Sequence, residues 1–250
     1  MASSHQSSLH ALLLLSDSAL PLGSFAFSSG LESFLAHTKD SNSAASQRLR
    51  AFEKFLEQSL RNIASTALPN VLTAYTHPDQ LENLDNDFDA STPCTVARRA
   101  SISQGKALLA IWERALATCI TESSPASEAV AAFATTLKQP KPDAFGLTLN
   151  GHFPPLFGTV CAALGLSKED TAYIFLLNHA KALLSAGVRA SVLGPYQSQA
   201  FLASGKLQGW VVSSVQREKA VEVSNAAVTV PTMDLWMGRH ELLYSRIFNS

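Results

Sequence analysis

Two Gly-Lys pairs, Gly105-Lys106 and Gly205-Lys206, have residue types that could bind a nucleotide phosphate. A phosphate-binding P-loop also requires a glycine five residues before the pair and Ser or Thr directly after it. Alanine occupies the upstream position in both cases, and alanine or leucine follows the lysine. We therefore do not expect this chain to hydrolyse nucleotides through a P-loop.

The sequence also lacks a convincing serine nucleophile. Ser103 and Lys106 have the S-x-x-K spacing of penicillin-recognising enzymes, but the companion S-D-N and K-T-G motifs are missing. The serines at Ser24, Ser28 and Ser29 do not form a G-x-S-x-G motif. An exposed lysine on an ordinary helix explains Lys106 better, and we predict no catalytic residues.

The metal-binding residue types are scattered along the chain. The seven histidines form no pair four residues apart, and no H-E-x-x-H motif is present. We expect His152 to be hydrogen-bonded at a helix start and His179 to be a hydrogen-bonded core or interface residue. A nickel-binding role for either histidine is the alternative, which the spacing does not support. The three cysteines form no C-x-x-C pair, which is typical of reduced structural thiols.

Composition indicates an ordered chain with a substantial core. Of the 250 residues, 46% are hydrophobic and 16% are charged. The formal net charge of -1 gives no basic field for nucleic acid, and no apolar run approaches the ~18 residues that span a membrane. The apolar run at 9–15 is interpreted as a helix, because no lysine or arginine of a signal peptide precedes it. We expect a cytoplasmic protein.

The elements that must position any site are predicted to be helices. Leucine and phenylalanine recur every three or four residues over 43–68, and Pro69 is expected to end this helix. Residues 221–230 have some β-branched alternation, but no partner strand is evident. The predicted fold is all-α, a single-domain helical bundle over 1–250 with mobile N- and C-terminal tails. Further helices are predicted over 95–120, 151–165 and 168–193.

Three stretches are predicted as loops or flexible segments: 1–8, 79–93 and 121–150. The second stretch is acidic, and the third carries three prolines, with room for one helix over 128–137. The final stretch, 231–250, is predicted to be a partner-binding tail.

Near the N-terminus, a turn at 21–24 precedes Phe25, Phe27, Leu31 and Glu32. Aromatic side chains beside one carboxylate are a plausible partner-binding patch. The alternative, that Phe25 and Leu31 belong to the core, stays open at this point.

The C-terminal tail combines aromatic residues with arginines, the residue types that are enriched in interface hot spots. We predict that it is poorly ordered alone and docks when a partner binds. With the N-terminal patch, the candidate partner-binding residues are Phe25, Glu32, Arg239, His240, Tyr244, Arg246 and Phe248.

Three separated stretches together resemble the UreF family of urease accessory proteins. The first, SDSALPLGSFAFSSGLES over 16–33, is similar to the family's N-terminal signature. The second, ARRASISQGKALL over 97–109, is similar to a family helix. The third combines Gly151-His152 and Phe157-Gly158 with the final MGRHELLYSRIFNS. The matches occur in the right order along most of the chain and are jointly specific, although the stretch 121–150 looks longer than in compact bacterial members.

The resemblance implies a non-catalytic scaffold for urease maturation that forms a homodimer. Its implied partners are a UreD-type accessory protein (also called UreH), the UreG-type GTPase and apo-urease. It implies no tightly bound cofactor, because nickel would be handled by the complex. Two alternatives are a helical hydrolase or transferase acting on a small molecule, and a general helical adaptor unrelated to urease.

Overall fold

The computed structural model describes residues 2–38, 45–120, 122–139, 142 and 146–249, with side chains from residue 8 onward. All regular elements in these ranges are helices, which confirms the predicted all-α bundle. The α-helices are α1 (Ala2–Ser16), α2 (Leu31–His37), α3 (Ala45–Thr76), α4 (Leu81–Ser91), α5 (Thr95–Ile111), α6 (Pro125–Lys138), α7 (Phe153–Ala163), α8 (Lys168–Arg189), α9 (Pro195–Leu202), α10 (Gly205–Glu218) and α11 (Thr232–Arg239).

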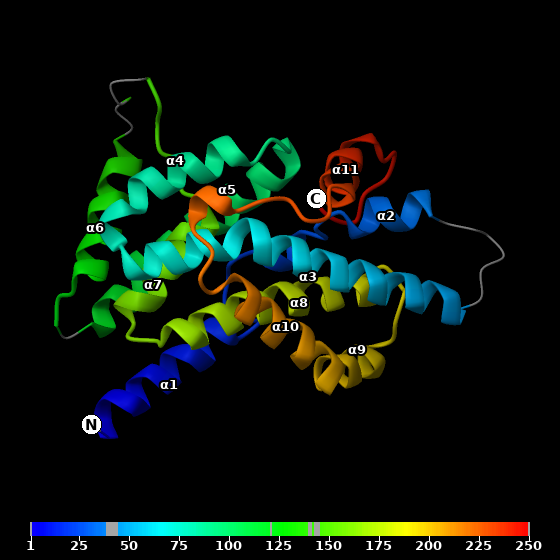
Figure 1. Cartoon of the computed structure of the whole chain (residues 1–250), viewed down its shortest axis with the longest axis horizontal. Helices are drawn as coiled ribbons and strands as arrows, with labels where there is room; N and C mark the ends of the chain where they lie inside the picture. Colours follow the sequence, from blue (N-terminus) through cyan, green and yellow to red (C-terminus); the bar gives the residue numbers. More distant parts are fainter. Residues whose placement is uncertain (1, 39–44, 121, 140–141, 143–145, 250) are drawn as a thin grey trace.

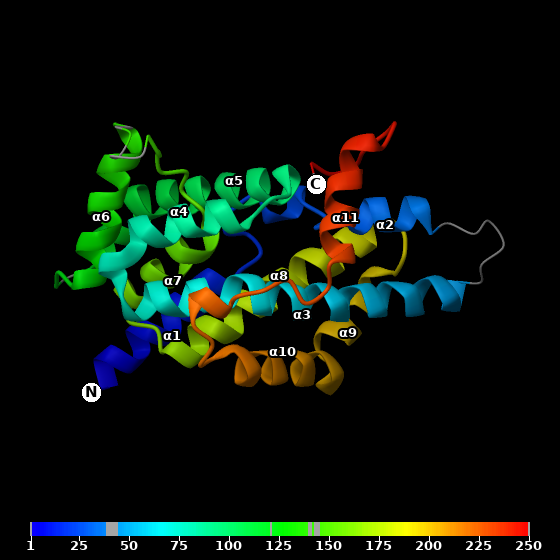
Figure 2. The ribbon, with the colours of Figure 1, turned by 45° about the horizontal axis from the view of Figure 1, so that its top comes forward.

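The bundle is organised around the long helix α3, which runs along the longest axis (Figure 1). Helices α7, α8 and α10 pack on α3, while α4, α5 and α6 gather beside α7 at one end. Helices α2 and α11 lie together at the other end (Figure 2). The core forms where the apolar faces of α3, α7 and α8 meet, with Leu60, Phe157 and Leu176 almost fully buried. Their burial agrees with the helical periodicity of these segments.

The prediction that Pro69 ends the helix over 43–68 is wrong, because this helix, α3, continues to Thr76. Proline cannot donate to the carbonyl four residues earlier, at Ser65, and such a loss normally breaks a helix. Here the residues on both sides of the proline, including Leu68 and Val71, are completely buried against neighbouring helices. Tertiary packing therefore outweighs the local cost of the proline.

The stretch 79–93 was predicted as a loop and is mostly the helix α4, so that prediction is wrong. Leu81, Leu84 and Phe88 recur at helical spacing and are buried, whereas Asp85 lies among them and masks the pattern. Residues 2–8, also predicted as a loop, belong to α1.

Within the predicted loop 121–150, the structure contains the helix α6, which includes the expected helix over 128–137. Ser124 and Ser127 form a reciprocal capping box at its start, so the backbone N–H groups there are satisfied. Positions 121, 140–141 and 143–145 of this predicted loop lie outside the described residues.

Helix α7 approaches α3 closely at Gly158, where any added Cβ would overlap the backbone carbonyl of Val71. Both helices are packed in the core, so neither backbone can move away from the added Cβ without a large cost in free energy. We expect Gly158→Ala to lower the free energy of unfolding by about 2 kcal/mol, measured by urea denaturation. Gly209→Ala is the control, since a Cβ there meets nothing within 4 Å and alanine favours a helix. Equal stability of the two variants would contradict this packing account.

No described helix is both long enough and apolar enough to cross a membrane.

Candidate partner-binding site

The two ends of the chain, which were singled out separately, meet in the structure. Helix α2 begins after Gly30, whose φ of +84° is left-handed. A Cβ at Gly30 would lie 3.0 Å from the backbone nitrogen of Met237 and 3.1 Å from Trp236 of α11. The rings of Phe34 and Trp236 then make an edge-to-face contact, with centroids 5.6 Å apart. Glycine therefore lets α2 and α11 approach each other.

Glu32 joins the N-terminal stretch to the C-terminal tail. Its carboxylate accepts hydrogen bonds from the backbone N–H groups of Ile247, at 2.7 Å, and Phe248, at 3.1 Å. His240 lies beside it, with Nδ1 3.8 Å from a Glu32 oxygen, while His240 Nε2 lies 3.0 Å from the carbonyl oxygen of Phe248. The N–H of Asn249 donates to the carbonyl of Ala26 at 2.8 Å. These bonds form one unit, which we call the clasp.

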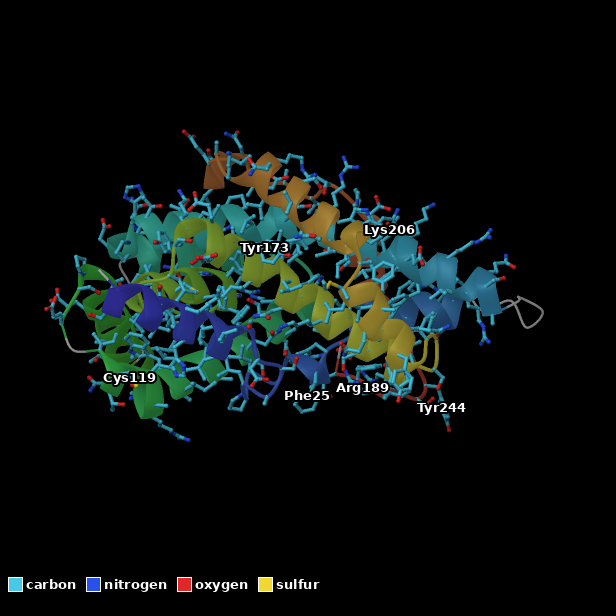
Figure 3. The ribbon with its side chains drawn as sticks, turned by 90° about the horizontal axis from the view of Figure 1, so that it is seen from below. Phe25, Cys119, Tyr173, Arg189, Lys206 and Tyr244 are labelled. Atoms are coloured by element: carbon cyan, nitrogen blue, oxygen red, sulfur yellow. The ribbon has the colours of Figure 1, made fainter. Side chains whose placement is uncertain are left out.

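The clasp divides the predicted site residues into two groups. His240 and Phe248 are buried, and the Glu32 side chain is only 13% exposed. These three residues therefore hold the tail in place and have little surface left for contact with a partner. Phe25, Tyr244, Arg239 and Arg246 are exposed. Figure 3 shows Phe25 and Tyr244 on the same edge of the molecule. The alternative that Phe25 is a core residue is wrong, although Leu31 is indeed core. Direct contact with a partner stays a prediction for the four exposed residues.

The tail has a docked conformation in the single chain, because α11 and the clasp bury Met233 and Phe248. That the tail is poorly ordered alone and becomes ordered when a partner binds stays a prediction.

The exposed charges around the clasp are partly paired. Glu241 accepts a hydrogen bond from Arg99 at 2.5 Å and from Arg246 at 2.9 Å, and these bonds lower the pKa of the Glu241 carboxyl. Arg239 donates from Nε to Nε2 of His37 at 3.3 Å. Exposed pairs of this kind stabilise a fold little, so these side chains remain available for a partner.

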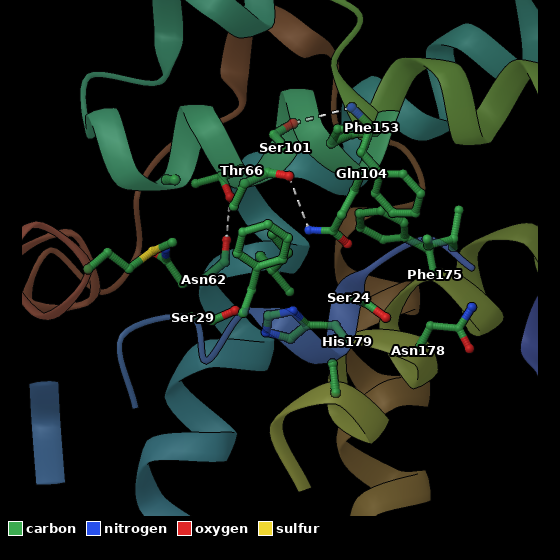
Figure 4. Close-up of a pocket in the computed structure, with 18 of the residues that line it drawn as sticks. Ser24, Ser29, Asn62, Thr66, Ser101, Gln104, Phe153, Phe175, Asn178 and His179 are labelled. Atoms are coloured by element: carbon green, nitrogen blue, oxygen red, sulfur yellow. Dashed lines mark hydrogen bonds between the residues drawn. The ribbon is translucent and has the colours of Figure 1, made fainter. Parts of the chain in front are cut away.

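A cavity of about 250 Å³ lies between α3, α5 and α8, next to the clasp. Figure 4 shows Gln104, Phe153, Phe175 and His179 around it. Its lining combines apolar side chains with amides, hydroxyls, His179 and the ionisable residues Asp17, Lys181 and Asp234. The described residues contain no group of three His, Cys, Asp or Glu that could hold a metal ion. The cavity lies near the exposed residue Phe25, and its lining does not bring together a nucleophile, a base and an oxyanion site.

His179 is hydrogen-bonded, as predicted, with Nε2 2.8 Å from the hydroxyl of Ser59, and it is partly buried at the wall of the cavity. Burial lowers its pKa to about 4, below the usual value of 6.5. Because the unfolded chain binds the proton more tightly, this group's stabilising contribution is complete above pH 6.5 and is lost as the pH falls towards 4.

We expect about 3 kcal/mol of stability to disappear in that pH range in wild type and not in His179→Gln. The measurement is urea denaturation at pH 7 and pH 4, with His77→Gln, an exposed position, as control. Parallel losses in wild type and His179→Gln would contradict the assignment.

Sequence reasoning missed a second buried polar network, centred on Asp85. This carboxylate is completely buried and accepts hydrogen bonds from the backbone N–H groups of Asn150, Gly151 and His152, at 2.7, 3.1 and 2.6 Å. Three charge-assisted bonds fix the start of α7. The signal in the sequence was a lone aspartate at a core position of a helical repeat, which was interpreted as loop composition.

His152 continues this network, as expected of a hydrogen-bonded helix-start residue. Its Nε2 lies 3.0 Å from Asp89 and its Nδ1 lies 3.0 Å from the hydroxyl of Ser101. Burial is the main cause that lowers the pKa of His152; Asp85 opposes it and Arg98 adds to it.

The serine, histidine and aspartate of this network resemble a hydrolase triad in residue type only. The Ser101 oxygen already accepts the N–H of Phe153, and His152 is completely buried. Asp85 occupies the nearby N–H groups that could otherwise stabilise an oxyanion. The geometry therefore favours a structural role.

Comparisons with known proteins agree with the motif pattern. The UreF family model matches residues 48–205. A urease accessory protein UreF-like protein of Schizosaccharomyces pombe is 39% identical over 245 residues, covering 98% of each chain. Urease accessory protein F of Oryza sativa subsp. indica is 32% identical, covering 99% of this chain and 87% of its own. Urease accessory protein UreF of Haemophilus influenzae is 27% identical, covering 97% of this chain and 95% of its own.

Proposed function

Because the chain belongs to the UreF family of urease accessory proteins and acts in urease maturation, we propose that it is a non-catalytic scaffold. With a UreD-type protein it recruits and regulates a UreG-type GTPase during nickel insertion into apo-urease. It works in the cytoplasm as a homodimer, and nickel is handled by the assembled complex rather than by a resident site on this chain.

The clasp is the observation that supports this proposal most directly. The buried residues His240 and Phe248 and the largely buried carboxylate of Glu32 hold the tail in place. Their effect is to present Phe25, which is 64% exposed, and Tyr244, which is fully exposed, on one edge. Exposed aromatic side chains on a rigid support are typical of a protein-binding surface, because little entropy is lost on docking.

Two alternatives fit the molecule less well. A hydrolase or transferase needs an accessible nucleophile and base, whereas His152 is completely buried and the hydroxyl of Ser101 is hydrogen-bonded to His152 and to the start of α7. A general adaptor unrelated to urease would need no family relation, and the relatives named as urease accessory proteins cover nearly the whole chain.

The proposal is tested by co-expressing the full chain with UreD-type and UreG-type proteins, followed by affinity purification and a urease activation assay. We expect a ternary complex with the wild-type chain. Failure to recover it, with all three proteins soluble, would count against the scaffold.

Phe25→Ala and Arg246→Ala should abolish activation while helicity and melting temperature stay unchanged, because both side chains are exposed. Arg114→Ala is the matched control, since Arg114 is an exposed arginine next to Glu113, which pairs with Lys138 of α6 at the other end. Normal activation by both test variants would show that the site is wrongly placed.

A further inference from the structure

Arg189, the last residue of α8, is an exposed cation whose guanidinium is fixed by aromatic rings. Its Cζ lies 4.4 Å from the centre of the Phe248 ring and 6.0 Å from that of Phe25. Its Nε makes one long hydrogen bond, 3.5 Å to the carbonyl of Ser185. Among the described residues, no carboxylate forms an ion pair with it, in contrast to Arg99 and Arg246, which share Glu241.

The guanidinium of Arg189 loses part of its hydration against the rings, and no ion pair with a described residue compensates for that loss. Partial burial against its neighbours lowers the pKa of Arg189. A cation at a helix C-terminus gains a few tenths of a kcal/mol from the helix dipole. The dipole does not explain why two rings, from residues far apart in the sequence, gather around the guanidinium. Of its five N–H donors, only that on Nε has a hydrogen-bond acceptor within the described part of the chain, and the rings restrict the orientation of the others.

The surroundings of Arg189 have the composition of an interface centre. Phe25 and Ile247 are 64% and 65% exposed, and the fully exposed Tyr244 lies further along the same edge (Figure 3). A carboxylate arriving here would be shielded by apolar side chains, and its bond to arginine would be strengthened by the loss of water.

We propose that Arg189 is a carboxylate-binding anchor for the UreD-type partner. It receives an acidic side chain, flanked by apolar residues, on the docked tail surface. This inference rests on the proposed function and adds the chemistry of recognition: a free, ring-stacked guanidinium selects a carboxylate in bidentate geometry, which a lysine would reproduce poorly.

The test measures the affinity of the full chain for the UreD-type protein by titration calorimetry at two salt concentrations. Arg189→Glu should weaken binding at least about 30-fold, and Arg189→Lys should weaken it less. Arg189→Met keeps an apolar stem against Phe248 but has no charge, so it should weaken binding and reduce its salt dependence. Arg114→Glu, with the same charge change in an exposed arginine beside α6, should bind like wild type.

The outcomes separate the two proposals. If the wild-type chain binds no UreD-type protein, the proposed function fails and the anchor fails with it. If the wild type binds and all three Arg189 variants bind equally well, only the anchor is overturned. If the variants turn a homodimer into a monomer but bind the UreD-type protein normally, the carboxylate belongs to a second copy and the anchor is again overturned. Should Arg189→Glu fail to fold, the Met and Lys variants decide.

Discussion

Replacing Asp85 with alanine is expected to lower the free energy of unfolding by about 4 kcal/mol. The carboxylate is completely buried and accepts three backbone N–H groups, those of residues 150–152. Alanine would leave these donors without a partner in the core. Hydrogen bonds to a charged group contribute more than neutral ones, and orphaned donors cost further desolvation.

Urea denaturation at neutral pH measures this effect. Asp87→Ala is the matched control, since Asp87 lies two residues away on the same helix and is exposed. It should change stability by less than about 0.5 kcal/mol. If Asp85→Ala lowered the free energy of unfolding no more than Asp87→Ala, the start of α7 would not depend on the Asp85 carboxylate.

Replacing Glu32 with alanine is expected to release the tail and weaken binding of the UreD-type partner roughly 100-fold, with a small effect on the melting temperature. The carboxylate accepts the N–H groups of Ile247 and Phe248 and lies beside His240. Without it, the tail must be ordered at the moment of binding, which costs affinity.

Hydrogen exchange reports the release directly: the amides of Ile247 and Phe248 should exchange roughly 100-fold faster in Glu32→Ala. Glu57→Ala, which changes an exposed glutamate on α3, should leave both amides protected. Unchanged protection in Glu32→Ala would show that the ring contacts of Phe248 alone hold the tail.

Periodicity predicted the helices whose apolar residues repeat without interruption, including α7 and α8. It failed where one residue carried a strong local signal that packing outweighs. Pro69 lies inside α3 because both of its flanks are buried, and Asp85 lies inside α4 because it satisfies backbone donors of another segment. Neither effect is visible within a local window of sequence.

The candidate site was predicted in pieces. The exposed aromatic residue Phe25 and the tail were both identified, but the sequence did not indicate that these two ends of the chain lie together. The partners of Glu32 are backbone N–H groups more than 200 residues away, and backbone donors leave no trace in residue types. Arg189 was missed because its stacking on Phe248 brings together two residues that lie far apart in the sequence.

We propose that the clasped ends of the chain form the surface through which this urease-maturation scaffold binds the UreD-type partner. Hydrogen exchange of the full chain, measured with and without this partner, locates the binding surface. We expect new protection in residues 24–32, around Arg189 and in residues 240–249, with α6 unchanged. Protection at α6 or α10, with none at the clasp, would contradict it.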